Sequence, residues 1–292
     1  MEKFVKFRAD TRKPTEPPPP KSCDCQVHVF GPIERYPTRA GASYVPPADA
    51  TGDAAERMHR TLGLERGVIV QATAYGTDHS AMVDALQGRP HYRGVAIIDN
   101  GVSDLELRRL HEAGVRGARF NFWKQLKIVP TPDGFERSIA RISEYGWHAR
   151  IHAAGDEWLD LKELLSKPRI PMVIDHMGHP DLRGGVDQPV LRLLRDFLKR
   201  ENWWIMISNA DRFSAAEQIW EDVVPIAESL LSAASPDRAI WSTDWPHVQY
   251  RRPMPNDAEL LEFLFRAVPG AELRRKVLAD NPARLHGFRN EA

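Results

Sequence analysis

The residues best placed to do chemistry come early, in the segment CDCQVHVFGP at 23–32. It is typical of a β-strand ended by Gly-Pro, and alternation predicts that Asp24, Gln26 and His28 share one face. Two residues along a strand is the spacing that directs two imidazoles at one metal ion, but the first position here is glutamine. Histidine can be a ligand, a base or an acid, whereas glutamine only donates and accepts hydrogen bonds. The pattern is that of a catalytic strand with one usual group removed, and this loss is the main indication of function.

Strand and helix patterns alternate along the rest of the chain. Short runs rich in Val and Ile predict strands at 24–30, 67–71, 93–98, 115–121, 148–152, 172–176, 203–208 and 239–244. Helical patterns lie at 53–63, 78–87, 103–113, 134–145, 156–166, 187–200, 214–232, 256–279 and 282–287. This alternation implies parallel βαβ units, and eight units imply an α/β fold of the closed (β/α)8 TIM-barrel type. We therefore expect one catalytic barrel domain at 23–292, preceded by an arm at 1–22.

The carboxyl ends of the predicted strands carry a strongly polar set of residues, and this is where such barrels place their chemistry. A packed core would not select so many groups that cost free energy when buried unpaired. The set is Gln26, His28, Gln71, Thr73, Asp99, Arg119, Asn121, His152, His176, Ser208, Asn209, Arg212 and Asp244. Three histidines, two arginines and an aspartate on one rim predict an enzyme site. His179 is a weaker candidate, and His247 is expected to support Asp244 from behind.

Composition narrows the class of protein. The chain has 292 residues and a formal net charge of zero, so nothing indicates nucleic acid or an anionic membrane as a partner. We find no signal peptide and no apolar run of about 18 residues, and we expect a cytoplasmic protein, with a homo-oligomer left open. Cys23 and Cys25 have poor disulfide spacing and are expected to pack opposite Gln26 and His28. The prolines at 17–20 favour an extended arm that lies on the body or on a neighbouring subunit.

Five strings at the predicted strand ends and near the C-terminus suggest a family: CQVHVFGP, RGARFNF, IDHMGHPD, WSTDWPHV and NPARLHGF. They resemble the 2-pyrone-4,6-dicarboxylate hydrolase group of the amidohydrolase superfamily, whose members include lactonases. The resemblance covers nearly the whole chain after residue 22. It implies that Asp244 is the general base, that Gln26 and His28 match the strand-1 histidine pair, and that His176 matches the strand-6 histidine.

The resemblance also implies roles and departures elsewhere in the site. Arg119 and Arg212 match arginines that hold substrate carboxylates. Gln26 replaces a histidine, Gln125 an arginine and His152 a tyrosine, which puts both the pyrone substrate and hydrolysis in question. The group also contains a galactarolactone isomerase, which moves a lactone linkage instead of opening it. In length and in the altered strand-1 motif, this chain resembles that member.

A metal site is the next question. His28, His152, His176 and Asp244 could together form a zinc site with three nitrogens and one oxygen. However, Gln26 replaces a familiar ligand. Arg119 also stands where metal-dependent relatives place a carboxylate or a carbamylated lysine, and a guanidinium beside a dication costs Coulomb energy. We therefore expect no metal and no cofactor.

The catalytic groups that are present, and the histidine and metal ion that are missing, favour rearrangement over hydrolysis. Without a metal and a second histidine, water activation is weakened, whereas a hydroxyl within the substrate gains about 10⁵–10⁸ M in effective concentration. The prediction is metal-independent acyl migration of galactaro-1,5-lactone to galactaro-1,4-lactone in hexuronate and aldarate catabolism. Asp244, His28, His176 and Gln26 would do the chemistry. The substrate-binding set would be Arg119, Arg212, His152, Asn121, Thr73, Asn209 and Gln125.

Other functions stay open at this point. The first is a lactone hydrolase acting on a dicarboxylate lactone such as 2-pyrone-4,6-dicarboxylate, which incorporation of solvent oxygen would reveal. The second is a ligand-binding barrel without activity, in which lactones raise the melting temperature but are not consumed. A metal-dependent decarboxylase branch of the superfamily ranks below both.

Overall fold

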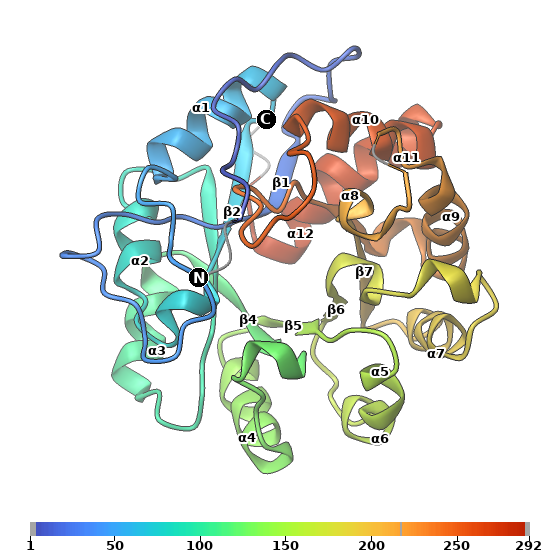
Figure 1. The fold of residues 1–292 in the computed structure, drawn as a ribbon. Helices are drawn as coiled ribbons and strands as arrows, with labels where there is room; N and C mark the ends of the chain where they lie inside the picture. Colours follow the sequence, from blue (N-terminus) through green and yellow to red (C-terminus); the bar gives the residue numbers. More distant parts are fainter. Residues whose placement is uncertain (1–3, 217, 290–292) are drawn as a thin grey trace.

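Eight parallel strands form the centre of the molecule in the computed structural model, which describes residues 4–216 and 218–289 (Figure 1). They follow chain order around the sheet, so the predicted α/β barrel is confirmed. The strands are β1 Cys23–Val27, β2 Arg66–Val70, β3 Tyr92–Ala96, β4 Val115–Asn121, β5 His148–His152, β6 Met172–Ile174, β7 Trp203–Ile207 and β8 Ala239–Trp241.

The segment just after β8 closes the barrel against β1. Val27 forms a parallel bridge with Trp245. The Asp244 backbone N–H donates to the Gln26 carbonyl at 3.1 Å, and the His28 N–H donates to the Trp245 carbonyl at 2.8 Å. The closure therefore brings candidate residues from the first and last strands side by side.

Helices surround the barrel on the outside (Figure 1). They are α1 Gly52–Leu62, α2 Ser80–Leu86, α3 Asp104–Glu112, α4 Pro132–Ser143, α5 Glu157–Asp160, α6 Lys162–Leu165, α7 Pro189–Leu198, α8 Ala210–Phe213, α9 Val224–Ala233, α10 Asp257–Ala267, α11 Ala271–Arg275 and α12 Asn281–His286. Thr51, Ser103, Thr131 and Asn256 each accept a backbone N–H of the first turn, as good N-caps do. Gly63 ends α1 in the left-handed conformation.

Element bounds differ from the predictions mainly where the backbone turns sharply. The predicted strands 115–121 and 148–152 match β4 and β5 residue for residue. The predicted strand 172–176 ends at Ile174, because His176 and Met177 take positive φ angles of 49° and 53°. The predicted helix 256–279 is divided between Val268 and Gly270, where Pro269 cannot continue α10. The predicted helices 156–166 and 214–232 are each replaced by two shorter helical segments.

The prediction that Asp24, Gln26 and His28 share one face of β1 is wrong for Asp24, whereas Gln26 and His28 both reach Asp244. The pairing of β1 with β2 slips between Asp24 and Val27, which marks a β-bulge. A bulge inserts one residue and breaks the two-residue alternation of a strand. Asp24 therefore accepts a hydrogen bond from His59 on α1, outside the barrel, while the Gln26 side chain points inward.

The two cysteines are also placed differently from the prediction. Cys23 and Cys25 are free, fully buried and part of the small cluster inside the barrel, with Val173, Met206 and Ile240. They thus lie on the inner side with Gln26 and not opposite it. The larger apolar cluster fills the space between the barrel and its helices.

The arm before β1 lies on the barrel body. The Val5 N–H donates to the Tyr250 carbonyl at 2.9 Å. Arg12 donates to Glu262 through both terminal nitrogens at 2.7 Å. Among the described residues, no helix has the length and apolar character that crossing a membrane requires.

Candidate active site

A cavity of about 350 Å³ opens at the carboxyl ends of the strands, a size typical of small-molecule sites. Most of the predicted site residues line it: His28, Thr73, Arg119, Gln125, His152, His176, Asn209, Arg212 and Asp244. Five others of the predicted set do not: Gln26, Gln71, Asp99, Asn121 and Ser208. Gln26 lies beneath the cavity, in contact with Asp244, and Asn121 lies behind His152.

Asp244 is the buried acid of the cavity. Gln26 Nε2 donates to its Oδ1 at 2.8 Å, and His28 Nε2 lies 3.5 Å from the same oxygen. Arg212 Nη2 lies 3.4 Å from Oδ2. Burial raises the pKa of this carboxyl, but the neighbouring His176 ring, the hydrogen bond with His28 and the Arg212 guanidinium outweigh it and hold the pKa well below its usual range. Asp244 is therefore an anion at neutral pH, able to accept a proton.

His28 is fixed by a carbonyl on one side and faces Asp244 on the other. Its Nδ1 lies 2.8 Å from the Val70 carbonyl oxygen, which can only accept, so Nδ1 carries a proton. Neutral His28 then presents a lone pair at Nε2. A second proton at Nε2 would be shared with Asp244, so the two side chains can pass a proton between them.

His176 has both ring nitrogens engaged. Its Nε2 accepts hydrogen bonds from Gln26 Nε2 at 2.9 Å and from Arg119 Nη2 at 3.2 Å, and both of these nitrogens can only donate. Nδ1, 2.8 Å from Ser208 Oγ, must therefore carry the ring proton. Burial lowers the pKa of His176 well below its ordinary value, against the opposing effect of Asp244. We therefore assign His176 as a neutral imidazole.

Arg119 forms the centre of a buried charge network in the cavity wall. Its Nε donates to Asp175 Oδ2 at 2.7 Å, and both side chains are almost fully buried. Arg150 Nη1 lies 3.9 Å from the other oxygen of Asp175. This arrangement holds the Arg119 guanidinium rigidly beside the cavity, as recognition of an anionic substrate group requires.

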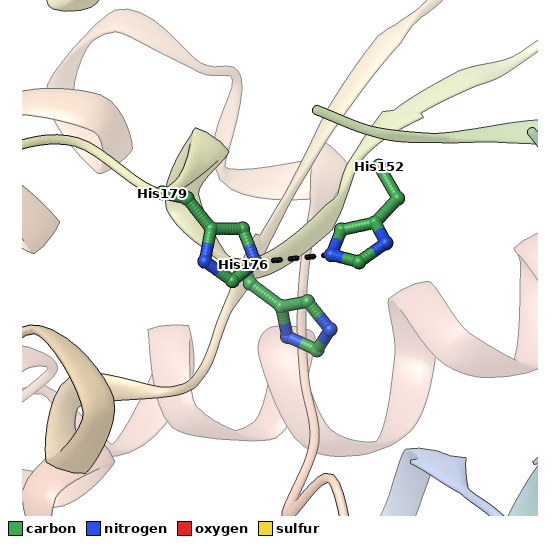
Figure 2. A group of neighbouring side chains, drawn as sticks. All are labelled: His152, His176 and His179. Carbon is green, nitrogen blue, oxygen red and sulfur yellow. Dashed lines mark hydrogen bonds between the residues drawn. The ribbon is translucent and has the colours of Figure 1, made fainter. Parts of the chain in front are cut away.

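His152 and His179 form a contact pair in another part of the wall (Figure 2), with 3.2 Å between their Nε2 atoms. His152 Nδ1 lies 3.0 Å from Asn121 Oδ1. Burial lowers the pKa of His179 to about 3 and that of His152 well below its ordinary value, so both rings are neutral. The rings of Trp123 and Phe213 lie 5.0 and 5.1 Å from that of His179. This part of the wall is therefore aromatic and uncharged.

His247 touches Asp244 through the backbone. Its N–H donates to the Asp244 carbonyl at 3.0 Å, while its ring pairs with Asp257 at 2.9 Å. Burial lowers the pKa of His247, but the hydrogen bond with Asp257 outweighs it and the pKa is raised. The ring thus fixes the loop that carries Asp244 through Asp257.

Several lining residues were not predicted from the sequence. They are Tyr44, Trp123, Leu126, Phe213, Val248, Gln249 and Arg251. All come from loops or from α8, beyond the strand ends that the prediction used. The loop after β4, which holds Trp123 and Leu126, directly follows the RGARFNF string. Its position after this string is the sequence feature that could have indicated Trp123 and Leu126.

Comparison with known proteins identifies the family. The amidohydrolase family model matches residues 23–288. A 2-pyrone-4,6-dicarboxylate hydrolase of Comamonas testosteroni is 37% identical over 97% of this chain and 95% of its own. A 4-sulfomuconolactone hydrolase of Hydrogenophaga intermedia is 37% identical, covering 92% of this chain and 89% of its own. The chain therefore belongs to the amidohydrolase family.

The isomerase that the sequence suggested is a more distant match. A D-galactarolactone isomerase of Agrobacterium fabrum is 27% identical over 91% of both chains. Among solved structures, the apo structure of an Agrobacterium tumefaciens protein superposes with a TM-score of 0.83 at 25% identity, covering 94% of this chain and 99% of that one. A candidate 2-pyrone-4,6-dicarboxylic acid hydrolase of Pseudomonas putida gives 0.81 at 29% identity, covering 93% and 99%.

Amidohydrolases often hold a metal ion, so the donor set needs testing. His152, His176 and His179 each offer a nitrogen within 4.8 Å of the others, among the described residues. However, the Nε2 lone pair of His176 already accepts hydrogen bonds from Gln26 and Arg119, and a metal ion bound there would face the positively charged Arg119 guanidinium. The side chains as arranged do not fit a metal between His176 and Asp244, because the Gln26 amide stands there. We derive no chemical step through a metal.

Proposed function

We propose that the protein hydrolyses a small lactone that carries anionic groups, of the 2-pyrone-4,6-dicarboxylate or sulfomuconolactone kind. The lactone hydrolases are the more similar relatives, at 37% identity against 27% for the isomerase. The observation that carries the proposal is the anionic Asp244 in the cavity beside the cationic Arg212. A buried base next to an anion-binding group suits hydrolysis of a charged ester.

The geometry also weakens the reason for preferring isomerisation. That reason was the loss of a histidine at position 26, expected to weaken the activation of water. Gln26 lies beneath the cavity and donates to Asp244, so it holds the base instead of leaving a gap beside the substrate. Water bound by Asp244 therefore remains a suitable nucleophile.

The proposed chemistry uses residues already in place. Asp244 takes a proton from a water molecule, whose oxygen forms a bond to the lactone carbonyl carbon. The N–H of His28, when protonated at Nε2, stabilises the charge that develops on the carbonyl oxygen, while Arg212 holds an anionic group of the substrate. The bond between that carbon and the ring oxygen then breaks. The ring oxygen receives the proton that Asp244 took up, either directly or through His28.

Solvent-oxygen incorporation tests the proposal. The protein is incubated in H₂¹⁸O with 2-pyrone-4,6-dicarboxylate, 4-sulfomuconolactone and galactaro-1,5-lactone, and products are read by mass spectrometry and NMR. We expect one ¹⁸O in the ring-opened product of an unsaturated lactone. Unlabelled galactaro-1,4-lactone, with no opening of the other two, would instead support acyl migration.

Arg212 should bind an anionic group of the substrate, and its removal should raise KM. Charge-assisted hydrogen bonds contribute about 1.5–3 kcal/mol, so Arg212→Met should raise KM for a dicarboxylate lactone roughly 10- to 150-fold. Arg212 is the more accessible of the two arginines, with 22% of its side chain exposed, so this substitution leaves the buried Arg119–Asp175 pair intact. The measurement is KM for charged and uncharged lactones. An equal rise for both would contradict a role in anion binding.

A further inference from the structure

Arg150 lies inside the barrel directly below the candidate site and was not among the predicted site residues. Its side chain is fully buried. Nη1 donates to Gln26 Oε1 at 2.9 Å, and Nη2 donates to the Cys25 carbonyl at 2.7 Å. Arginine stays protonated and offers only donors, so the atom of Gln26 that faces it must be the carbonyl oxygen.

This contact fixes the direction of the Gln26 amide. With Oε1 held by Arg150, Nε2 must point the other way, where it contacts Asp244 Oδ1 at 2.8 Å and His176 Nε2 at 2.9 Å. Each of the two N–H groups then has an acceptor. The amide therefore requires that Oδ1 of Asp244 carries no proton and that the proton of His176 is on Nδ1, next to Ser208.

We propose that Arg150 is a positioning residue that keeps Gln26 a donor to Asp244 and His176 throughout the reaction. The proposal rests on the hydrolytic function described above, in which Asp244 is protonated for part of the cycle. An unrestrained amide could then rotate and accept a hydrogen bond from the new carboxylic acid, which would stabilise the acid. Arg150 prevents this rotation, so Gln26 offers no acceptor for the proton of the protonated Asp244. Asp244 therefore readily returns that proton to the leaving ring oxygen.

Steady-state kinetics of Arg150 and Gln26 variants test this role. Residues one step removed from a reacting centre commonly change activity about 10–100-fold in metal sites, and we expect a loss of that size in kcat for Arg150→Met, with KM nearly unchanged. Arg150→Lys keeps a donor towards Oε1 and should recover most of the loss. In a Gln26→Met background, Arg150→Met should cause little further loss, because there is no amide left to orient. An equal loss in both backgrounds would show that Arg150 acts only on packing.

Nitrogen-15 NMR of histidine-labelled protein tests the same inference without any substrate. In the wild type, His176 should show a protonated Nδ1 and an unprotonated Nε2. Gln26→Glu keeps Arg150 and removes the amide donor, leaving Arg119 as the only one of the two donors to His176 Nε2, so the fraction of His176 protonated at Nε2 should rise. This variant also serves if Arg150→Met does not fold. A wild-type His176 protonated at Nε2 would overturn the inference, whereas failure to open any lactone would overturn only the proposed function.

Discussion

Replacing Asp244 by asparagine is expected to lower kcat by about 10²–10⁴-fold, the usual contribution of general acid–base catalysis. Asparagine has nearly the same shape and can accept the Gln26 N–H, but it cannot take a proton from water. Asp244 is the carboxylate that contacts both His28 and Arg212, so the substitution removes the proton acceptor from this group of side chains. The measurement is kcat for lactone opening, with circular dichroism and thermal unfolding to show that the variant is folded.

Asp257→Asn is the matched control. Asp257 is also a buried carboxylate paired with a histidine, His247, but it does not line the cavity. We expect it to lose stability while kcat falls much less than in the Asp244 variant. If the folded Asp244→Asn protein kept wild-type turnover, the assignment of the base would have to be abandoned.

Sequence reasoning predicted most of the residues that gather around the candidate cavity, because barrel topology is simple. The polar residues at the carboxyl ends of predicted strands, such as His28, Arg119 and Asp244, must converge once eight strands close. This argument needs only the strand order, and small errors in strand bounds do not affect it. The same reasoning identified the fold, because βαβ alternation leaves few topologies.

The parts that sequence reasoning missed depend on local backbone geometry. The bulge in β1 follows from no residue preference that the segment shows, yet it decides that Asp24 faces α1 and Gln26 faces inward. Arg150 lies two residues before His152 on β5. Nothing in the sequence indicates that its side chain contacts Gln26. His179, a weaker candidate from the sequence, lines the cavity, but the left-handed conformation at His176 just before it was not predicted.

A second large effect concerns stability in acid. Five histidines have lowered pKa values, each mainly because burial disfavours the charged ring: the buried His148, His152, His176 and His286, and the less buried His179. His148 and His286 pack against each other inside the barrel floor, with ring centroids 4.9 Å apart. A proton on any of these rings places a charge where burial has removed most of the water that would solvate it.

The protein should therefore lose much of its stability between pH 7 and pH 5. The unfolded chain binds protons below the ordinary histidine pKa of about 6.5, while the folded rings stay neutral, so the free energy of unfolding falls as pH drops. Each such ring lowers the free energy of unfolding by on the order of 2 kcal/mol at pH 5. The total free energy of unfolding of a domain is only about 5–15 kcal/mol. His247, whose pKa is raised, acts in the opposite direction but is a single group. Urea unfolding at a series of pH values measures the effect.

His286→Phe isolates one of these contributions. Phenylalanine keeps an aromatic ring against His148 but cannot be protonated, so the loss of stability between pH 7 and pH 5 should shrink by about 2 kcal/mol. His91→Gln is the control, because the His91 side chain is 39% exposed and its removal should leave the pH dependence nearly unchanged. A wild-type urea midpoint that does not move between pH 7 and pH 5 would mean that the rings are hydrated or charged in the folded protein. The neutral state assigned to His152, His176 and His179 in the cavity wall would then have to be given up.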